Sequence, residues 1–112
     1  MPRKAVICVG IAAYPISGAG IAWFYLQWIL AFRELGWDVC VMEELRSEKR
    51  VDTSWKPCAY ERSANRRHWE TVMRRFSLEE CSSLLIDGKA VNFADAQRFA
   101  NDADIFLNIS GH

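Results

Sequence analysis

The first 44 residues contain two short apolar runs separated by a glycine-bearing loop and a long apolar segment. Residues 5–9 and 39–42 are continuous apolar runs, which are typical of parallel strands covered on both faces. Between them, residues 21–35 have the length of a helix, and Gly36 stands where helices commonly end. This order predicts a βαβ unit with a right-handed crossover.

The rest of the chain continues the alternation of helix and strand after a long connection. Residues 45–60 mix charges with Pro57 and are expected to be irregular. A second helix is expected over 61–76, because Trp69, Val72, Met73 and Phe76 recur at helical spacing. The remaining expected elements are a strand at 82–86 with a turn at Asp87-Gly88, a short helix at 93–101 capped by Asn92, and a strand at 105–109.

These elements predict a Rossmann-like three-layer α/β domain with a mostly parallel sheet of about four strands. A chain of 112 residues has room for one such domain, spanning residues 1–112. Only Ser110, Gly111 and His112 follow the last expected strand, so no helix covers it. Because α/β domains normally close their layers, the fold is expected to be incomplete. The chain would then be half of a larger protein or would pair with a copy of itself.

Composition narrows the classes of function. Fourteen acidic residues balance 14 basic residues, whereas nucleic-acid-binding domains usually carry a basic excess, so no nucleic-acid partner is expected. The apolar helix is too short to span a bilayer. No Cys-x-x-Cys pair occurs, so no metal site is expected. The expected setting is the reducing cytoplasm, with reduced thiols at Cys8, Cys40, Cys58 and Cys81.

The loop from Gly10 to Gly20 is the first candidate site. It joins a strand end to a helix start, where backbone N–H groups can approach a ligand and the helix favours an anion such as pyrophosphate. Its glycine spacing matches neither the dinucleotide fingerprint nor the phosphate loop of nucleotide hydrolases. The alternative is that the glycines serve only a tight turn and helix packing. The candidate ligand-binding residues are Tyr14, Ser17, Gly18 and Gly20.

Two titratable residues near the expected strand ends are further candidates. Glu43 lies just over twenty residues beyond Gly20, where dinucleotide-binding proteins hold the ribose with an acid; an acid after a strand is also common without that role. His112 follows the last strand on the same side and is a candidate general base, or merely a terminal residue. His68 lies on an arginine-rich helix and is expected to be exposed. The arginines of that helix form either a solvated face or a phosphate-contacting patch: Arg62, Arg66, Arg67, Arg74 and Arg75.

Two stretches, WFYLQWILAFRELGWDVCVMEEL and ADIFLNISGH, resemble the N-terminal half of bacterial glycosyltransferases with two facing Rossmann-like domains, the GT-B class. That family has a glycine loop, a helix of the form W-x-Y-L-Q, then L-G-H-D-V, an acidic pair and a later A-D-x-x-L-N-x-S-G strand end. Trp37 replaces the histidine of the third motif. The matching residues are Trp23, Tyr25, Leu26, Gln27, Leu35, Gly36, Asp38, Val39, Glu43, Glu44, Ala103, Asp104, Leu107, Asn108, Ser110 and Gly111.

The resemblance implies that two domains have separate roles in substrate binding. The N-terminal domain of such enzymes binds a small-molecule acceptor, and its glycine loop faces the donor diphosphate. No tightly bound cofactor is implied, because a nucleotide-sugar serves as co-substrate. The C-terminal domain, which makes most donor contacts, is missing from this chain, so a further domain or a partner chain is expected. Ser110, Gly111 and His112 would join Tyr14, Ser17, Gly18 and Gly20 along the cleft.

A second class of function stays open from the residues alone. The chain could be a stand-alone Rossmann-like module that binds a nucleotide or dinucleotide, with Glu43 as the ribose ligand. Its apolar helix, which carries Trp23, Phe24, Tyr25 and Trp28, would then form a homodimer contact. A third alternative is a non-catalytic chain whose role is assembly.

Overall fold

One five-stranded sheet organises the protein, in a computed structural model that describes residues 2–16, 19–92 and 96–109. The strand order is β4-β3-β2-β1-β5, and all neighbours are parallel except β4, which pairs antiparallel with β3. The predicted α/β class with a mostly parallel sheet is confirmed. The strands are β1 (Lys4–Cys8), β2 (Asp38–Glu44), β3 (Ser82–Ile86), β4 (Lys89–Asn92) and β5 (Ile105–Asn108).

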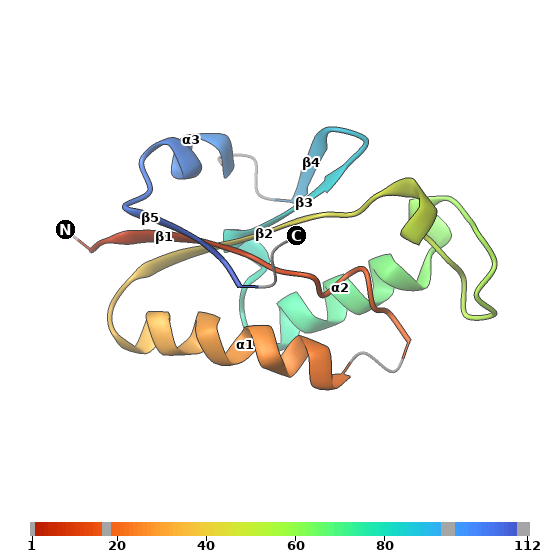
Figure 1. Cartoon of the computed structure of the whole chain (residues 1–112), viewed down its shortest axis with the longest axis horizontal. Coiled ribbons are helices and arrows are strands. Elements are labelled where there is room, and N and C mark those ends of the chain that lie inside the picture. Colours follow the sequence, from red (N-terminus) through yellow and green to blue (C-terminus); the bar gives the residue numbers. More distant parts are fainter. Residues whose placement is uncertain (1, 17–18, 93–95, 110–112) are drawn as a thin grey trace.

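Helices cover both faces of the sheet and produce the three layers (Figure 1). Two long helices, α1 (Ala19–Glu34) and α2 (Ala64–Arg75), lie on one face, and the short α3 (Ala96–Asn101) lies on the other. Helix α1 ends at Glu34, and Gly36 follows just beyond its end, as expected. Gly36 has a φ of 89° and donates its N–H to the carbonyl of Arg33 at 3.0 Å. Glycine adopts this left-handed conformation without steric cost.

One predicted helix start is wrong, and one strand, β4, was not predicted. Helix α2 begins at Ala64 and not at 61, because Ser63 is extended and its hydroxyl accepts the N–H of Arg66 at 3.1 Å, which caps the helix. Residues Tyr60–Arg62 form a separate 3₁₀ turn. Asn92 is the last residue of β4, and the expected helix start at Phe93 lies outside the described residues.

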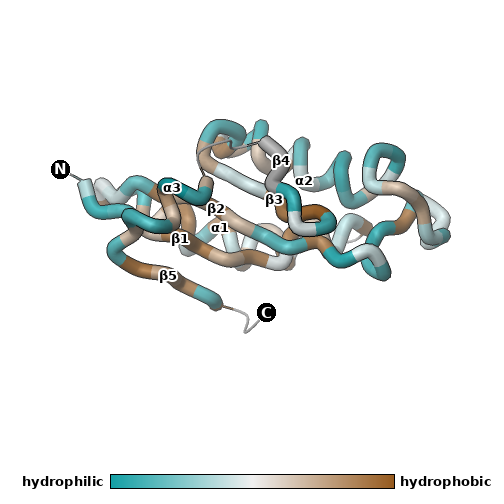
Figure 2. The backbone as a smooth tube through the Cα atoms, turned by 90° about the horizontal axis from the view of Figure 1, so that it is seen from above, coloured by the Kyte–Doolittle hydropathy of each residue, from teal (hydrophilic) through white to brown (hydrophobic). Residues whose placement is uncertain are grey.

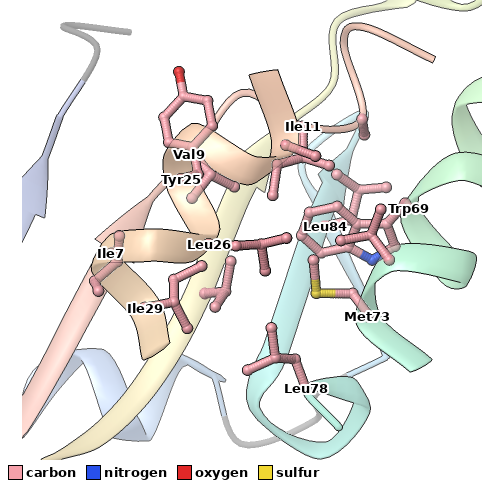
Figure 3. Close-up of a cluster of buried hydrophobic side chains, with 14 of the residues drawn as sticks. Ile7, Val9, Ile11, Tyr25, Leu26, Ile29, Trp69, Met73, Leu78 and Leu84 are labelled. Atoms are coloured by element: carbon pink, nitrogen blue, oxygen red, sulfur yellow. The ribbon is translucent and has the colours of Figure 1, made fainter. Parts of the chain in front are cut away.

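The main hydrophobic core lies between the sheet and the two long helices (Figure 3). Leu26 and Ile29 of α1 face the sheet, and Trp69 and Met73 of the neighbouring helix α2 enter the same core. Trp69 is the largest fully buried side chain. Full burial of one such side chain contributes about 3 kcal/mol through the apolar area removed from water. The two helices are therefore held against the same face of the sheet.

The sheet topology reverses at β1, which lies between β2 and β5. The connection from β1 to β2 runs through α1 on one face, and the connection that enters β5 runs through α3 on the other (Figure 1). In open α/β sheets ligands bind at such a reversal, beyond the carboxyl ends of the strands. At the opposite end, Asp104 accepts the N–H of Lys4 through its carboxylate and donates its own N–H to the Lys4 carbonyl, both at 2.8 Å. Asp104 thus fixes β5 against β1 away from the candidate site.

Candidate ligand site at the strand ends

The loop that follows β1 is part of the core for its first four residues. Val9, Gly10, Ile11 and Ala12 are all buried. The Val9 N–H still donates to the Met42 carbonyl of β2 at 2.9 Å, so the chain leaves the sheet only after this residue. The loop then turns across the carboxyl end of β2. Its backbone polar groups lie in a buried region and need partners from within the protein.

Glu43, near the end of β2, supplies those partners with its carboxylate. One oxygen accepts the N–H groups of Ile11 and Ala12 at 2.7 and 2.8 Å, and the other accepts the N–H of Ala13 at 2.9 Å. Three successive N–H groups form a concavity of the kind that binds anions in many proteins. Here the anion comes from the chain itself, and the Glu43 side chain is only 5% exposed. These three N–H groups are therefore already occupied by an internal ligand.

Asn65, in the first turn of α2, holds the same loop from the other side. Its amide nitrogen donates to the carbonyls of Ala12 at 2.7 Å and Lys49 at 3.0 Å, and its oxygen accepts the N–H of Val51 at 2.9 Å. The side chain is completely buried. Asn65 thus ties the first loop, the long connection after β2 and α2 together. This role could not be predicted from the sequence, because an asparagine close to Ser63 is ordinary composition for the start of a helix.

The buried position of Glu43 changes its titration. Burial raises the pKa of Glu43 to about 7, although the N–H groups of Ala12, Ala13 and Ile11 lower it against that effect. Between the unfolded pKa of 4.5 and about 7 the folded state holds a proton that the unfolded state has released. The contribution of protonated Glu43 to the free energy of unfolding is therefore complete below pH 4.5, and it is lost as the pH rises through about 7.

We expect the free energy of unfolding of the wild type to fall by up to about 3 kcal/mol over this range, relative to a Glu43→Gln variant, at 1.36 kcal/mol per pKa unit. Burial lowers the pKa of His68, which gives an opposite pH trend common to both proteins. The difference between their urea unfolding curves from pH 4.5 to 8 isolates Glu43. A difference that is constant with pH would contradict this assignment.

Of the other residues predicted for the site, the structure describes two, Tyr14 and Gly20, and both are exposed. Tyr14 follows the buried part of the loop and is exposed, and its N–H donates to the Ile11 carbonyl at 3.1 Å. Gly20 lies in the first turn of α1 and is also exposed. The ribose-binding role of Glu43 stays a prediction, and in this structure both oxygens of its carboxylate are used within the loop. Five candidates lie outside the described residues: Ser17, Gly18, Ser110, Gly111 and His112.

The arginine-rich helix α2 differs from expectation at one position. His68 is half-buried and not exposed, and its Nε2 atom is buried without a hydrogen-bond partner among the described residues. Arg66 pairs with Glu70 one turn along at 3.1 Å and donates to the Glu61 carbonyl at 3.2 Å. These contacts within the helix and its preceding turn favour the solvated-face interpretation for Arg66 over the phosphate-contacting one.

The thiols do not form a second reactive centre. All four cysteines are free, and burial raises the pKa of Cys8 and Cys81 and takes that of Cys40 to about 12. A thiol with a raised pKa is a poor nucleophile. Among residues 2–16, 19–92 and 96–109, no three acidic, histidine or cysteine side chains gather in a way that would hold a metal ion.

Comparison with models of protein families, with curated proteins and with solved structures found no match. Within the described ranges, none of the helices combines the length and the apolar character needed to cross a membrane. The geometry at the strand ends is therefore the main guide to function.

Proposed function

We propose that this chain is the acceptor-side domain of a glycosyltransferase that uses a nucleotide-sugar donor. The observation that carries the proposal is the topological reversal at β1, with a loop that leads from its carboxyl end directly into α1. This is the place where a phosphate-bearing ligand binds in open α/β sheets. The sequence resemblance to GT-B glycosyltransferases supports the same assignment. The acceptor would be a small molecule bound in the same cleft.

The arrangement of Glu43 favours this function over a stand-alone dinucleotide-binding module. A dinucleotide site needs the acid after the second strand to face the ribose hydroxyls. Glu43 instead accepts three N–H groups of the first loop and is almost fully buried. Its neighbour Glu44 is exposed and could take the ribose, but it belongs to the other face of β2, since successive strand residues alternate.

The groups left for a diphosphate begin after the part of the loop that Glu43 occupies. They are the backbone N–H of Ile16 and those of the first turn of α1, which contains no acidic residue; the Tyr14 N–H already donates to the Ile11 carbonyl, and Pro15 has none. N–H groups at a helix start stabilise negative charge, so they would favour departure of the nucleoside diphosphate in sugar transfer. In the resembling enzymes the residues after this strand line the same cleft, so Ser110, Gly111 and His112 stay candidates, with His112 as general base.

The source of the donor contacts determines which measurement can test the proposal. Sugar transfer requires both substrates to be positioned in one cleft, and most donor contacts in the resembling enzymes come from a second domain. We therefore expect this chain by itself to bind a nucleoside diphosphate weakly and to transfer sugar poorly. A further domain or a partner chain would complete the enzyme.

Gly20→Ala separates binding from folding. A methyl group at Gly20 would meet no atom within 4 Å. The change should leave stability unchanged or raise it by about 0.4–1 kcal/mol, because alanine restricts the unfolded chain. If the diphosphate lies against the first turn of α1, the methyl group should weaken binding of uridine and guanosine diphosphates at least about tenfold, or 1.4 kcal/mol. Native mass spectrometry and calorimetric titration measure this change.

Gln27→Ala is the matched control, because Gln27 is exposed on α1 two turns from Gly20. It should leave nucleotide binding as in the wild type. Equal binding by the wild type and Gly20→Ala would place the ligand elsewhere. Absence of any nucleoside diphosphate binding by the folded wild-type chain would contradict the proposed site.

A further inference from the structure

An apolar stripe runs along the outside of α1 and its C-terminal turn. Ile21, Phe24, Trp28 and Leu35 are all large and exposed, with Trp28 at 45% and Leu35 at 76% exposure. Their spacing of three, four and seven residues places them along one line of the helix. Four exposed apolar side chains in a row form a contiguous patch and differ from the isolated surface residues of ordinary proteins.

The stripe lies on the flank of α1 that faces away from α2. Trp23, on the other flank, packs against Phe76 just after α2, with ring centroids 6.3 Å apart. Helix α2 and β5 lie on opposite sides of α1, as the view from above shows (Figure 2). The stripe is therefore directed toward the side of the molecule where β5 forms the edge of the sheet.

Strand β5 lies at the edge of the described sheet and lacks the usual protection against pairing. Its strand partner among the described residues is β1 alone. The segment Ile105–Asn108 contains no charged residue and no proline, which are the residues that normally protect an edge strand. Phe106 is 59% exposed. Phe106 pairs with Val6 and lies on the α3 face of the sheet, whereas Leu107 pairs with Ile7 on the face that α1 covers. The strand edge thus has an exposed apolar side chain on one face and the α1 stripe on the other, and we call these together the β5 edge surface.

We propose that the β5 edge surface binds a second copy of this chain, with the two β5 strands paired antiparallel across a two-fold axis. Such a contact must be self-complementary, because the same surface serves both copies. The stripe meets this condition: Ile21 and Leu35 each lie seven residues, two helical turns, from Trp28. With the two α1 helices antiparallel, Trp28 faces the partner's Trp28, and Ile21 faces the partner's Leu35.

Area and charge agree with a copy of this chain as the occupant. A buried aromatic side chain covers roughly 150–250 Å², so Phe24, Trp28 and Phe106 at half exposure offer about 300 Å². The aliphatic stripe residues and the strand edge bring this to about 500 Å² per copy, or the roughly 1,000 Å² that a specific interface requires. The formal net charge is zero, so two copies do not repel each other. Antiparallel pairing also separates the two Asp104 carboxylates, one at each end of the β5 pair.

Sedimentation over protein concentrations from about 1 to 200 µM tests the proposal by mass action. The wild type should approach twice the 12.9 kDa chain mass as concentration rises. Trp28→Gln in the stripe and Phe106→Lys in the edge should each raise the dimer dissociation constant at least about tenfold. Both side chains are exposed, so circular dichroism should show an unchanged fold. Amide hydrogen exchange at residues 105–108 should also slow as concentration rises.

Trp55→Asn is the matched control. Trp55 is also an exposed tryptophan, but it lies in the connection after β2 and has a φ of 66°, which asparagine adopts readily. This variant should dimerise like the wild type. A wild type that stays monomeric throughout the range, or a dimer that both Trp28→Gln and Phe106→Lys leave intact, would overturn the proposal.

Discussion

Glu43→Gln is expected to destabilise the protein by about 2–4 kcal/mol at pH 4.5, and by less at pH 8, where ionisation of the buried acid removes stability from the wild type. The Glu43 carboxyl accepts three N–H groups through two oxygens, and the hydroxyl oxygen of the protonated acid can still accept. Glutamine has nearly the same shape but replaces one oxygen with an NH₂ group, which cannot accept and would oppose an N–H of the loop. At least one buried N–H is then left without a partner. Urea unfolding measures the loss.

Glu44→Gln controls for the removal of one charge from the same strand end. Glu44 is adjacent in sequence but exposed, so its replacement should change stability by less than about 0.5 kcal/mol. If Glu43→Gln proved as mild as Glu44→Gln, the carboxylate would not be the internal ligand of the first loop. The explanation of why those N–H groups are closed to substrate would then be wrong.

Asn65→Ala is expected to cost a similar amount, about 2–4 kcal/mol, since it leaves one buried and two partly buried backbone groups without their partner. The change removes contacts to the Ala12 and Lys49 carbonyls and to the Val51 N–H. Thermal unfolding of the variant should show the loss directly. Asn101→Ala is the matched control, because Asn101 is exposed at the end of α3 and accepts one hydrogen bond from Gln97.

The effects of Glu43→Gln and Asn65→Ala on the free energy of unfolding should not be additive. Glu43 holds the N–H of Ala12, and Asn65 holds its carbonyl, so both side chains fix the same residue of the loop. Residues that share a partner in this way show coupling energies of roughly 0.5–3 kcal/mol in double-mutant cycles. A sum of the two single effects in the double variant would show that Glu43 and Asn65 act on the loop independently.

The elements that carry the site could be predicted because their sequences are long and strongly patterned. The runs that became β1 and β2 are apolar throughout, and α1 ends at a glycine that takes the expected left-handed conformation. By contrast, β4 is a four-residue edge strand of sequence KAVN, whose short and partly polar pattern resembles a loop. The turn at Asp87-Gly88 was recognised, but the strand it leads into was not.

The internal contacts of the site could not be predicted in the same way. Placing Glu43 against the first loop requires the register between β1 and β2, and runs buried on both faces carry no alternation that reveals which way a side chain points. Glu43 was predicted to lie near a ligand only because of the number of residues that separate it from Gly20. Asn65 is a contact across 53 residues to Ala12, which no local pattern encodes.

We propose that a nucleoside diphosphate binds at the end of β1, beyond the N–H groups that Glu43 occupies. Two-dimensional NMR of backbone amides during titration with uridine diphosphate locates the ligand. The amides of Ile16 and of the first turn of α1 should shift on binding. The amides of Ile11, Ala12 and Ala13 should keep their resonances, because their hydrogen bonds to Glu43 persist. Shifts centred on those three amides, or confined to the β3–β4 turn, would contradict it.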